Sequence, residues 1–224
     1  MATRQLLARL ANGFCDASGH RVVVESVGGV DAVRRLAAGE AFDVAVLASD
    51  AVAKLIATGH LVAGTESVVA LSTVAAAVPA GRAAPELRTL PQLVSVLLQA
   101  DAIGYSTGPS GKALLDRLED WGILDTLRPR LQQAPPGKPV AEMVSRGEVD
   151  IGFQQRSEMI HSPGVTLLPH LPAQAEIVTA FVAAACRSTS RLADARAFID
   201  ALCCEASAEA KYAEGMQPAP WLQR

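Results

Sequence analysis

The chain has 224 residues and a net charge of −3, with 50% hydrophobic and 19% charged residues. This length suffices for one large domain or two small ones whose core needs no disulfide or metal. The mild acidity and the lack of a Lys/Arg cluster argue against a nucleic-acid partner. No apolar run reaches the roughly 18–20 residues of a membrane span, so direct membrane insertion is not expected.

The four cysteines form neither a C-x-x-C motif nor a cluster with histidine at zinc-ligand spacing. Cys203 and Cys204 are adjacent, and neighbouring cysteines do not easily reach disulfide geometry. We therefore expect unpaired thiols and no metal site.

The first 60 residues alternate helical and strand patterns. We expect helices over 1–17 and 30–38, strands over 21–26 (RVVVES) and 42–48 (FDVAVLA), and a helix capped by Ser49 or Asp50 that ends at Gly59. The nearly continuous apolar run of 42–48 is typical of a strand that is buried on both faces of a parallel sheet.

The rest of the chain contains two long β-rich runs and shorter strand–helix repeats between them. The predicted strands are 67–79, 102–105, 149–154 and 177–186. The first predicted helix is opened by Thr89 and Pro91, and the later helices are 112–121, 140–146 and 191–214, the last with a break near Glu205. The two long runs flank a middle segment with its own repeats. This order predicts two α/β lobes, residues 1–72 with 180–224 and residues 73–179, with a ligand cleft between them.

Small polar residues follow several predicted strands, where ligands collect in open parallel sheets. The turn S-T-G-P-S-G at 106–111 places Ser106, Thr107, Ser110 and Gly111 at a helix N-terminus, whose dipole favours an anion. The alternative for Ser110 is ordinary helix capping.

A second polar segment follows the strand at 149–154. Gln154 and Gln155 can donate and accept hydrogen bonds, and Arg156 can hold a carboxylate in a bidentate fork. The alternatives are loop amides and a solvated arginine. Glu158 is a candidate base or a salt-bridge partner. No Ser-His-Asp or Cys-His arrangement is evident from the spacing, which argues against a hydrolase.

At these residues the sequence resembles the molybdate-binding-protein-like branch of type 2 periplasmic solute-binding proteins. The similar segments are ESVGGVDAVRRLAAGEAFDVAVLAS, IGYSTGPSGKALLDRLEDWGI, PVAEMVSRGEVDIGFQQRSEMI and PGVTLLPHLP, within a match from about residue 17 to about residue 216.

The resemblance implies an α/β fold of two lobes, each a mostly parallel sheet flanked by helices, that closes on a small anion. The implied ligand-binding residues are Thr3, Ser26, Gly28, Gly29, Ser49, Ser106, Thr107, Ser110, Gly111, Gln154, Gln155, Arg156 and Ser157. It implies no cofactor and, as a partner, an ABC transporter permease. Relatives begin with a strand before the first helix, so we expect that the first strand of lobe 1 is missing from this sequence.

Two departures from the family bear on the ligand. Molybdate binders offer a hydroxyl in the loop matching Gly28-Gly29-Val30 and a tyrosine at the position of Gln155, and this chain has neither. The amides and Arg156 suit an organic acid with planar carboxylates better than a tetrahedral oxyanion. We therefore expect a carboxylate rather than molybdate.

Two other functions remain open. The same branch includes sequences that resemble aconitate isomerase, a cofactor-free enzyme that moves a double bond within a tricarboxylate, so the chain is either a binding protein or such an enzyme. The candidate catalytic residues are then Glu158 and His161, with Glu25 and Asp50 as further bases. An intracellular sensor domain is the third possibility. We expect a periplasmic location if a longer precursor exists, and a cytoplasmic one if Met1 is the true start.

Overall fold

A computed structural model describes residues 1–135, 137–169 and 171–219. The chain divides into two compact units. The first comprises Met1–Ser72 and the chain from Thr179 onward, and the second comprises Thr73–Val178. Among the described residues, no helix has both the length and the apolar character needed to cross a membrane.

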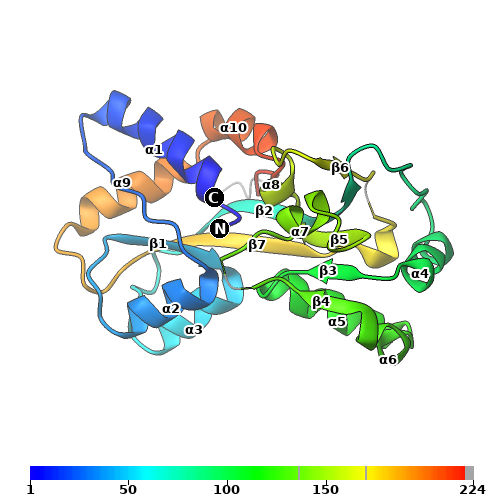
Figure 1. Ribbon diagram of the computed structural model, residues 1–224. Helices are drawn as coiled ribbons and strands as arrows, with labels where there is room; N and C mark the ends of the chain where they lie inside the picture. Colours follow the sequence, from blue (N-terminus) through cyan, green and yellow to red (C-terminus); the bar gives the residue numbers. More distant parts are fainter. Residues whose placement is uncertain (136, 170, 220–224) are drawn as a thin grey trace. The chain divides into compact units, whose positions relative to one another are not determined.

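The first unit contains helices on both faces of a small set of strands (Figure 1). Its elements are α1 (Arg4–Ser18), α2 (Gly29–Ala37), β1 (Val44–Ala48), α3 (Ser49–Ala57), the first part of β2 (Ser67–Pro79), β7 (Val178–Ala185), α9 (Leu192–Cys203), η3 (Glu205–Ser207) and α10 (Ala208–Ala213). The strand order is β1-β7-β2, and β1 pairs antiparallel with β7.

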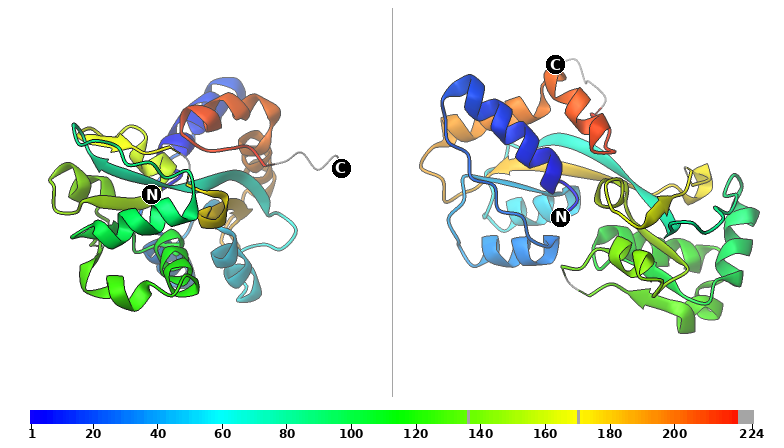
Figure 2. Two further views of the ribbon diagram at one scale, coloured as in Figure 1. Left: turned by 90° about the vertical axis from the view of Figure 1, so that its right-hand side faces the viewer. Right: turned by 45° about the horizontal axis from the view of Figure 1, so that its top comes forward.

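Side chains alternate between the two faces of β1 and β7, and each face packs into a separate hydrophobic core. Val46 and Ala183 face α1, α9 and α10, whereas Leu47 and Ala184 face α2 and α3. Figure 2 shows α1 running beside α9. The predicted strand at 42–48, buried on both faces, is therefore confirmed for Val44–Ala48. Its predicted parallel pairing is wrong, because β1 pairs antiparallel with β7.

The second unit is built on a parallel core of three strands. Its elements are the second part of β2, α4 (Leu90–Gln99), β3 (Ile103–Tyr105), α5 (Pro109–Asp120), α6 (Leu124–Leu127), η1 (Arg128–Arg130), β4 (Leu131–Gln133), α7 (Val140–Ser145), β5 (Ile151–Gln155), α8 (Arg156–Met159), β6 (Val165–Leu167) and η2 (Ala173–Ala175). β3 pairs in parallel with both β4 and β5, and β2 pairs antiparallel with β5 and β6.

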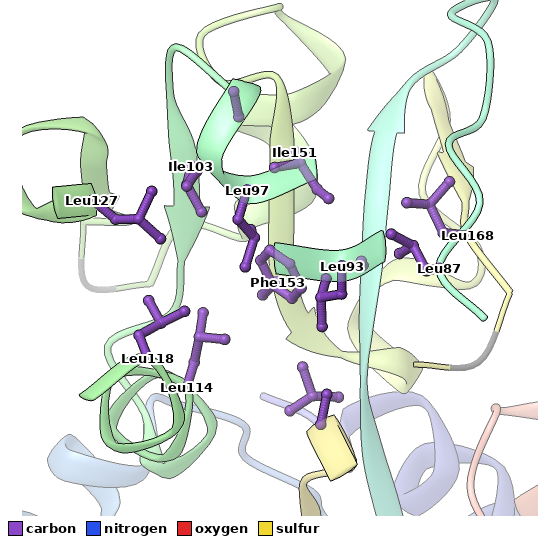
Figure 3. Packing of buried hydrophobic residues seen from close by; sticks show 14 of the residues in the cluster. Leu87, Leu93, Leu97, Ile103, Leu114, Leu118, Leu127, Ile151, Phe153 and Leu168 are labelled. Atoms are coloured by element: carbon purple, nitrogen blue, oxygen red, sulfur yellow. The ribbon is translucent and has the colours of Figure 1, made fainter. Parts of the chain in front are cut away.

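The two faces of β3 and β5 carry different side chains. Ile103, Ile151 and Phe153 point into a leucine-rich core with α4, α5 and α6 (Figure 3). The opposite face holds Gly104 and Gly152, on which α7 packs. A Cβ atom at Gly152 would lie 2.5 Å from Val144 Cγ2 and 2.6 Å from Val140 Cγ1. Only a residue without a side chain lets α7 come this close to β5.

Several predicted elements are confirmed with small shifts in their ends. The strand at 67–79 has the predicted bounds, and β7 differs from its predicted range by one residue at each end. Thr89 caps α4, because its hydroxyl accepts a hydrogen bond from Gln92 N–H, and the break near Glu205 separates α9 from α10. The short strands β4 and β6 were not predicted.

The predicted strand at 21–26 is wrong. Its run of valines favours a strand, but none of these described residues enters a ladder of hydrogen bonds. Val22 N–H donates to Cys15 Sγ at 3.3 Å, and Val23 is 71% exposed. β-Propensity gives a strand only where a neighbouring strand supplies the hydrogen bonds.

The predicted cap of α3 is also wrong. The N-cap residue is Ala48, and Ser49 and Asp50 lie in the first turn without a side-chain capping bond. The strand β1 runs directly into the helix, which leaves no loop residue in which a hydroxyl or carboxylate could adopt the capping geometry.

The first unit contains a buried lysine. Lys211 lies on α10 beside Ala210 and is only 1% exposed. Burial lowers the pKa of the Lys211 ammonium. The folded state therefore binds this proton less tightly than the unfolded state. Stability should rise with pH between the lowered value and the usual pKa of about 10.4.

We predict that Lys211→Met increases the free energy of unfolding at neutral pH by about 1–2 kcal/mol, because methionine keeps the unbranched stem and removes the desolvated charge. The variant should also lose the alkaline rise in stability. Urea denaturation from pH 7 to pH 10 measures both effects, with Lys54→Met, at an exposed position on α3, as the control. A destabilised Lys211→Met protein would contradict the prediction.

Candidate functional site

Polar residues of the second unit lie where β3 and β5 end. The two strands are parallel and in register, with Tyr105 opposite Phe153. Ser106 and Gln154 are the next residues on the two strands, so both lie at the same edge of the sheet. The parallel pairing thus brings together the two polar segments, which are almost 50 residues apart in sequence.

The turn after β3 is compact and rich in hydroxyl groups. Ser106 Oγ and Ser110 Oγ are 2.8 Å apart and share a hydrogen bond, and both side chains are buried. Thr107 is exposed. The helix α5 begins at Pro109, and its N-cap residue is Gly108. The alternative of Ser110 as a helix cap is therefore wrong, because Ser110 lies inside the first turn and bonds to Ser106.

Gly111 makes this turn possible. A Cβ atom at this position would lie 1.8 Å from the carbonyl oxygen of Ser106. The helix α5 can therefore approach the end of β3 only with glycine here. The result is a 12-residue helix whose N-terminus carries two buried hydroxyls, a suitable place for an anion.

The segment after β5 combines buried polar groups with an arginine. Gln154 and Gln155 are the last two residues of the strand, and both are buried. Ser157 Oγ is buried and has no hydrogen-bond partner among the described residues. Arg156 is partly exposed and has no ion pair in the part of the chain that the structure describes. Its guanidinium is thus available to a carboxylate.

Glu158 is the acidic group of this segment. Its Oε2 atom accepts a hydrogen bond of 2.9 Å from Gln154 Nε2. Burial raises the pKa of the Glu158 carboxyl, and the hydrogen bond from Gln154 only partly offsets this effect. A partly buried carboxyl held by a fixed hydrogen-bond donor is suited to act as a general acid or base.

The other candidate bases lie in different surroundings. His161 is exposed beyond α8, and Asp50 is exposed in the first turn of α3. Glu25 forms an ion pair of 2.7 Å with Arg35. Glu158 is therefore distinguished from them by burial and by a dedicated hydrogen-bond donor.

The predicted residues of the first unit lie at the starts of its helices. Thr3 precedes α1, Ser26 and Gly28 precede α2, Gly29 is the first residue of α2, and Ser49 is the first residue of α3. The terminal amine of Met1 donates to the Val27 carbonyl at 3.4 Å, which joins the starts of α1 and α2. In Figure 1 these three helices begin at the same end of the unit. Thr3 is buried but makes no side-chain capping bond.

Among the described residues, no three His, Cys, Asp or Glu side chains gather as a metal site. The bond between Gln154 and Glu158 was not anticipated from the sequence. Their spacing of four residues is that of neighbours on a helix, but here it spans the junction from β5 to α8. The one available signal was a glutamine directly after an apolar strand and before an acidic residue.

The fold and this site define a ligand-binding protein of two α/β units, and comparison with known proteins identifies the family. Residues 1–217 match the family model for bacterial extracellular solute-binding proteins, and the chain belongs to this family. The predicted type 2 periplasmic-binding fold and the resemblance to its molybdate-binding-protein-like branch are thereby confirmed.

One relative is an enzyme. The chain is 30% identical over 186 residues to aconitate isomerase of Pseudomonas sp., covering 83% of this chain and 71% of the relative. Among solved structures, the periplasmic molybdate-binding protein of Azotobacter vinelandii is similar with a TM-score of 0.81 and 21% identity, over 98% of this chain and 96% of that one. The fructose-6-phosphate-bound AfuA of Actinobacillus pleuropneumoniae has a TM-score of 0.73 and 15% identity, over 95% and 81%.

We predict that Gly111→Ala destabilises the protein, because the added methyl group would overlap the Ser106 carbonyl. A loss of about 1–3 kcal/mol in the free energy of unfolding is expected, as for other overpacked sites. Chemical denaturation measures it. Gly108→Ala is the matched control, since a Cβ atom there meets nothing within 4 Å. Equal stability of the two variants would contradict the prediction.

Proposed function

We propose that this protein binds a small organic carboxylate through the polar edge of its second unit, formed by the 106–111 turn together with Arg156 and Ser157. The observation that carries the proposal is the conjunction of three groups at the ends of adjacent strands. These are the buried hydroxyls at the N-terminus of α5, the buried Ser157 hydroxyl and the Arg156 guanidinium, which forms no ion pair with the described residues.

Each group suits a carboxylate. The helix N-terminus and the hydroxyls supply hydrogen-bond donors and a favourable potential, and the arginine fork matches a planar carboxylate in two parallel bonds. Membership of a bacterial extracellular solute-binding family supports action outside the cytoplasm. It also supports delivery of the ligand to an ABC transporter permease.

The binding function predicts a clear order of affinities. In calorimetry, citrate or trans-aconitate should bind, and molybdate should bind more weakly or not at all. Ser110→Ala should weaken carboxylate binding about fivefold to tenfold, equivalent to the loss of one hydrogen bond of about 1 kcal/mol.

Ser95→Ala is the matched control, because Ser95 is exposed on α4 of the same unit. Tight molybdate binding would refute the preference for carboxylates. Unchanged affinity in Ser110→Ala would remove this hydroxyl from the binding site.

A second candidate function is isomerisation of a tricarboxylate by proton transfer. It is favoured by the partly buried Glu158, whose pKa is raised by burial, and by the similarity to an aconitate isomerase. A carboxylate beside an anion site repels an anionic ligand and so does not help simple binding. Isomerisation, in contrast, requires a base beside the bound carboxylate, because the base removes a proton from a neighbouring carbon atom of the ligand.

The second function predicts turnover of trans-aconitate. Proton NMR in D₂O should show isomerisation and uptake of solvent deuterium at catalytic protein concentrations. Glu158→Gln, which keeps an acceptor for Gln154, should lower kcat by roughly 10²–10⁴-fold. Binding of trans-aconitate without turnover or deuterium uptake in the unmodified protein would leave binding as the function and reject the enzyme.

A further inference from the structure

The environment of Gln154 begins with the glycines beneath α7. Because Gly152 has no side chain, Val140 and Val144 of α7 contact β5 closely. Gln154 lies two residues further along the strand and therefore on the same face as Gly152. The first turn of α7 is thus within reach of the Gln154 side chain.

Both ends of the Gln154 amide are engaged. Its Oε1 atom accepts a hydrogen bond of 2.7 Å from the backbone N–H of Val140, and its Nε2 atom donates to Glu158 Oε2 at 2.9 Å. The Val140 N–H can only donate, so the amide oxygen must face α7. The NH₂ group must then face Glu158. The side chain is 4% exposed.

We propose that Gln154 is a positioning residue that holds the Glu158 carboxylate in place, and not a ligand-binding residue. The inference rests on the second proposed function, in which Glu158 transfers the proton. The chain of contacts starts at the Gly152–α7 packing, passes through the N-terminus of α7 and the Gln154 amide, and ends at the carboxylate.

Glutamine meets the requirements of this position in both length and chemistry. A donor is needed on the side of Glu158 and an acceptor on the side of Val140, and an amide supplies one of each. Glutamate at 154 would keep the acceptor for Val140. It would lose the donor to Glu158 and place a second carboxylate beside it. The two negative charges would repel each other.

The test exchanges the two groups. We compare Gln154→Glu, Glu158→Gln and the double variant Gln154→Glu/Glu158→Gln, in which the hydrogen bond is re-formed with its direction reversed. Gln133→Glu is the control, since it adds the same charge at the exposed last residue of β4, which pairs with β3 and not with β5. Denaturation midpoints and kcat and KM for trans-aconitate are measured for each.

The double variant should regain the denaturation midpoint lost in Gln154→Glu. Its kcat should stay roughly 10²–10⁴-fold below that of the unmodified protein, because the carboxylate has moved. KM should change little. Recovery of kcat together with stability would show that the pair is merely structural and would overturn the proposal. So would an unchanged kcat in Gln154→Glu.

A second measurement does not depend on turnover. Gln154→Met removes the donor, so ¹³C NMR titration should show that the pKa of Glu158 rises further. An unchanged Glu158 titration overturns the positioning role, even in a protein that converts no trans-aconitate. If the titration moves and the unmodified protein shows no turnover, positioning stands and only the enzymatic function fails.

Discussion

The close packing of α7 against the glycine face of β3 and β5 is the constraint on which the polar site of the second unit depends. Side chains at Gly104 and Gly152 would meet Val140, Val144 and Val149 at 2.5–3.1 Å. Without this approach, the Val140 N–H could not reach Gln154, and the amide would not be fixed between α7 and Glu158. A packing requirement in the core thus sets the orientation of a polar group at the sheet edge.

The same strands also bring together the hydrogen-bond donors of the polar edge. Parallel register places the ends of β3 and β5 side by side, so the N-terminus of α5 and the residues after β5 form one polar edge. Gly111 lets α5 begin directly at this edge, and the Ser106–Ser110 bond orders its hydroxyls. Arg156 adds a cation with directional donors. In the proposed function, these groups would hold an anion with planar carboxylates in preference to a tetrahedral oxyanion.

The two proposed functions, binding and isomerisation, differ in the role that they give to the Glu158 carboxylate. A protein that only captures a carboxylate gains nothing from a second carboxylate nearby, because the two charges repel. Glu158 is partly buried and accepts a hydrogen bond from the Gln154 amide, and burial raises its pKa. This arrangement suits proton transfer, which is the step that the second proposed function requires. If both proposals hold, the turn at 106–111 and Arg156 bind the anion and Glu158 transfers the proton.

The sequence by itself determined the α/β class, most helices and long strands, and the polar segments at 106–111 and 154–158, because hydrophobic periodicity and glycine or proline signals are local. It overestimated the strand at 21–26, since propensity cannot supply a hydrogen-bonding neighbour. It also predicted a cap at Ser49 or Asp50 that the start of α3 does not use. Tertiary structure alone decided that Ser106 bonds Ser110 and that Gln154 is held between Val140 and Glu158. The first contact depends on the close approach of α5 to the end of β3 at Gly111, and the second depends on how closely α7 packs on β5.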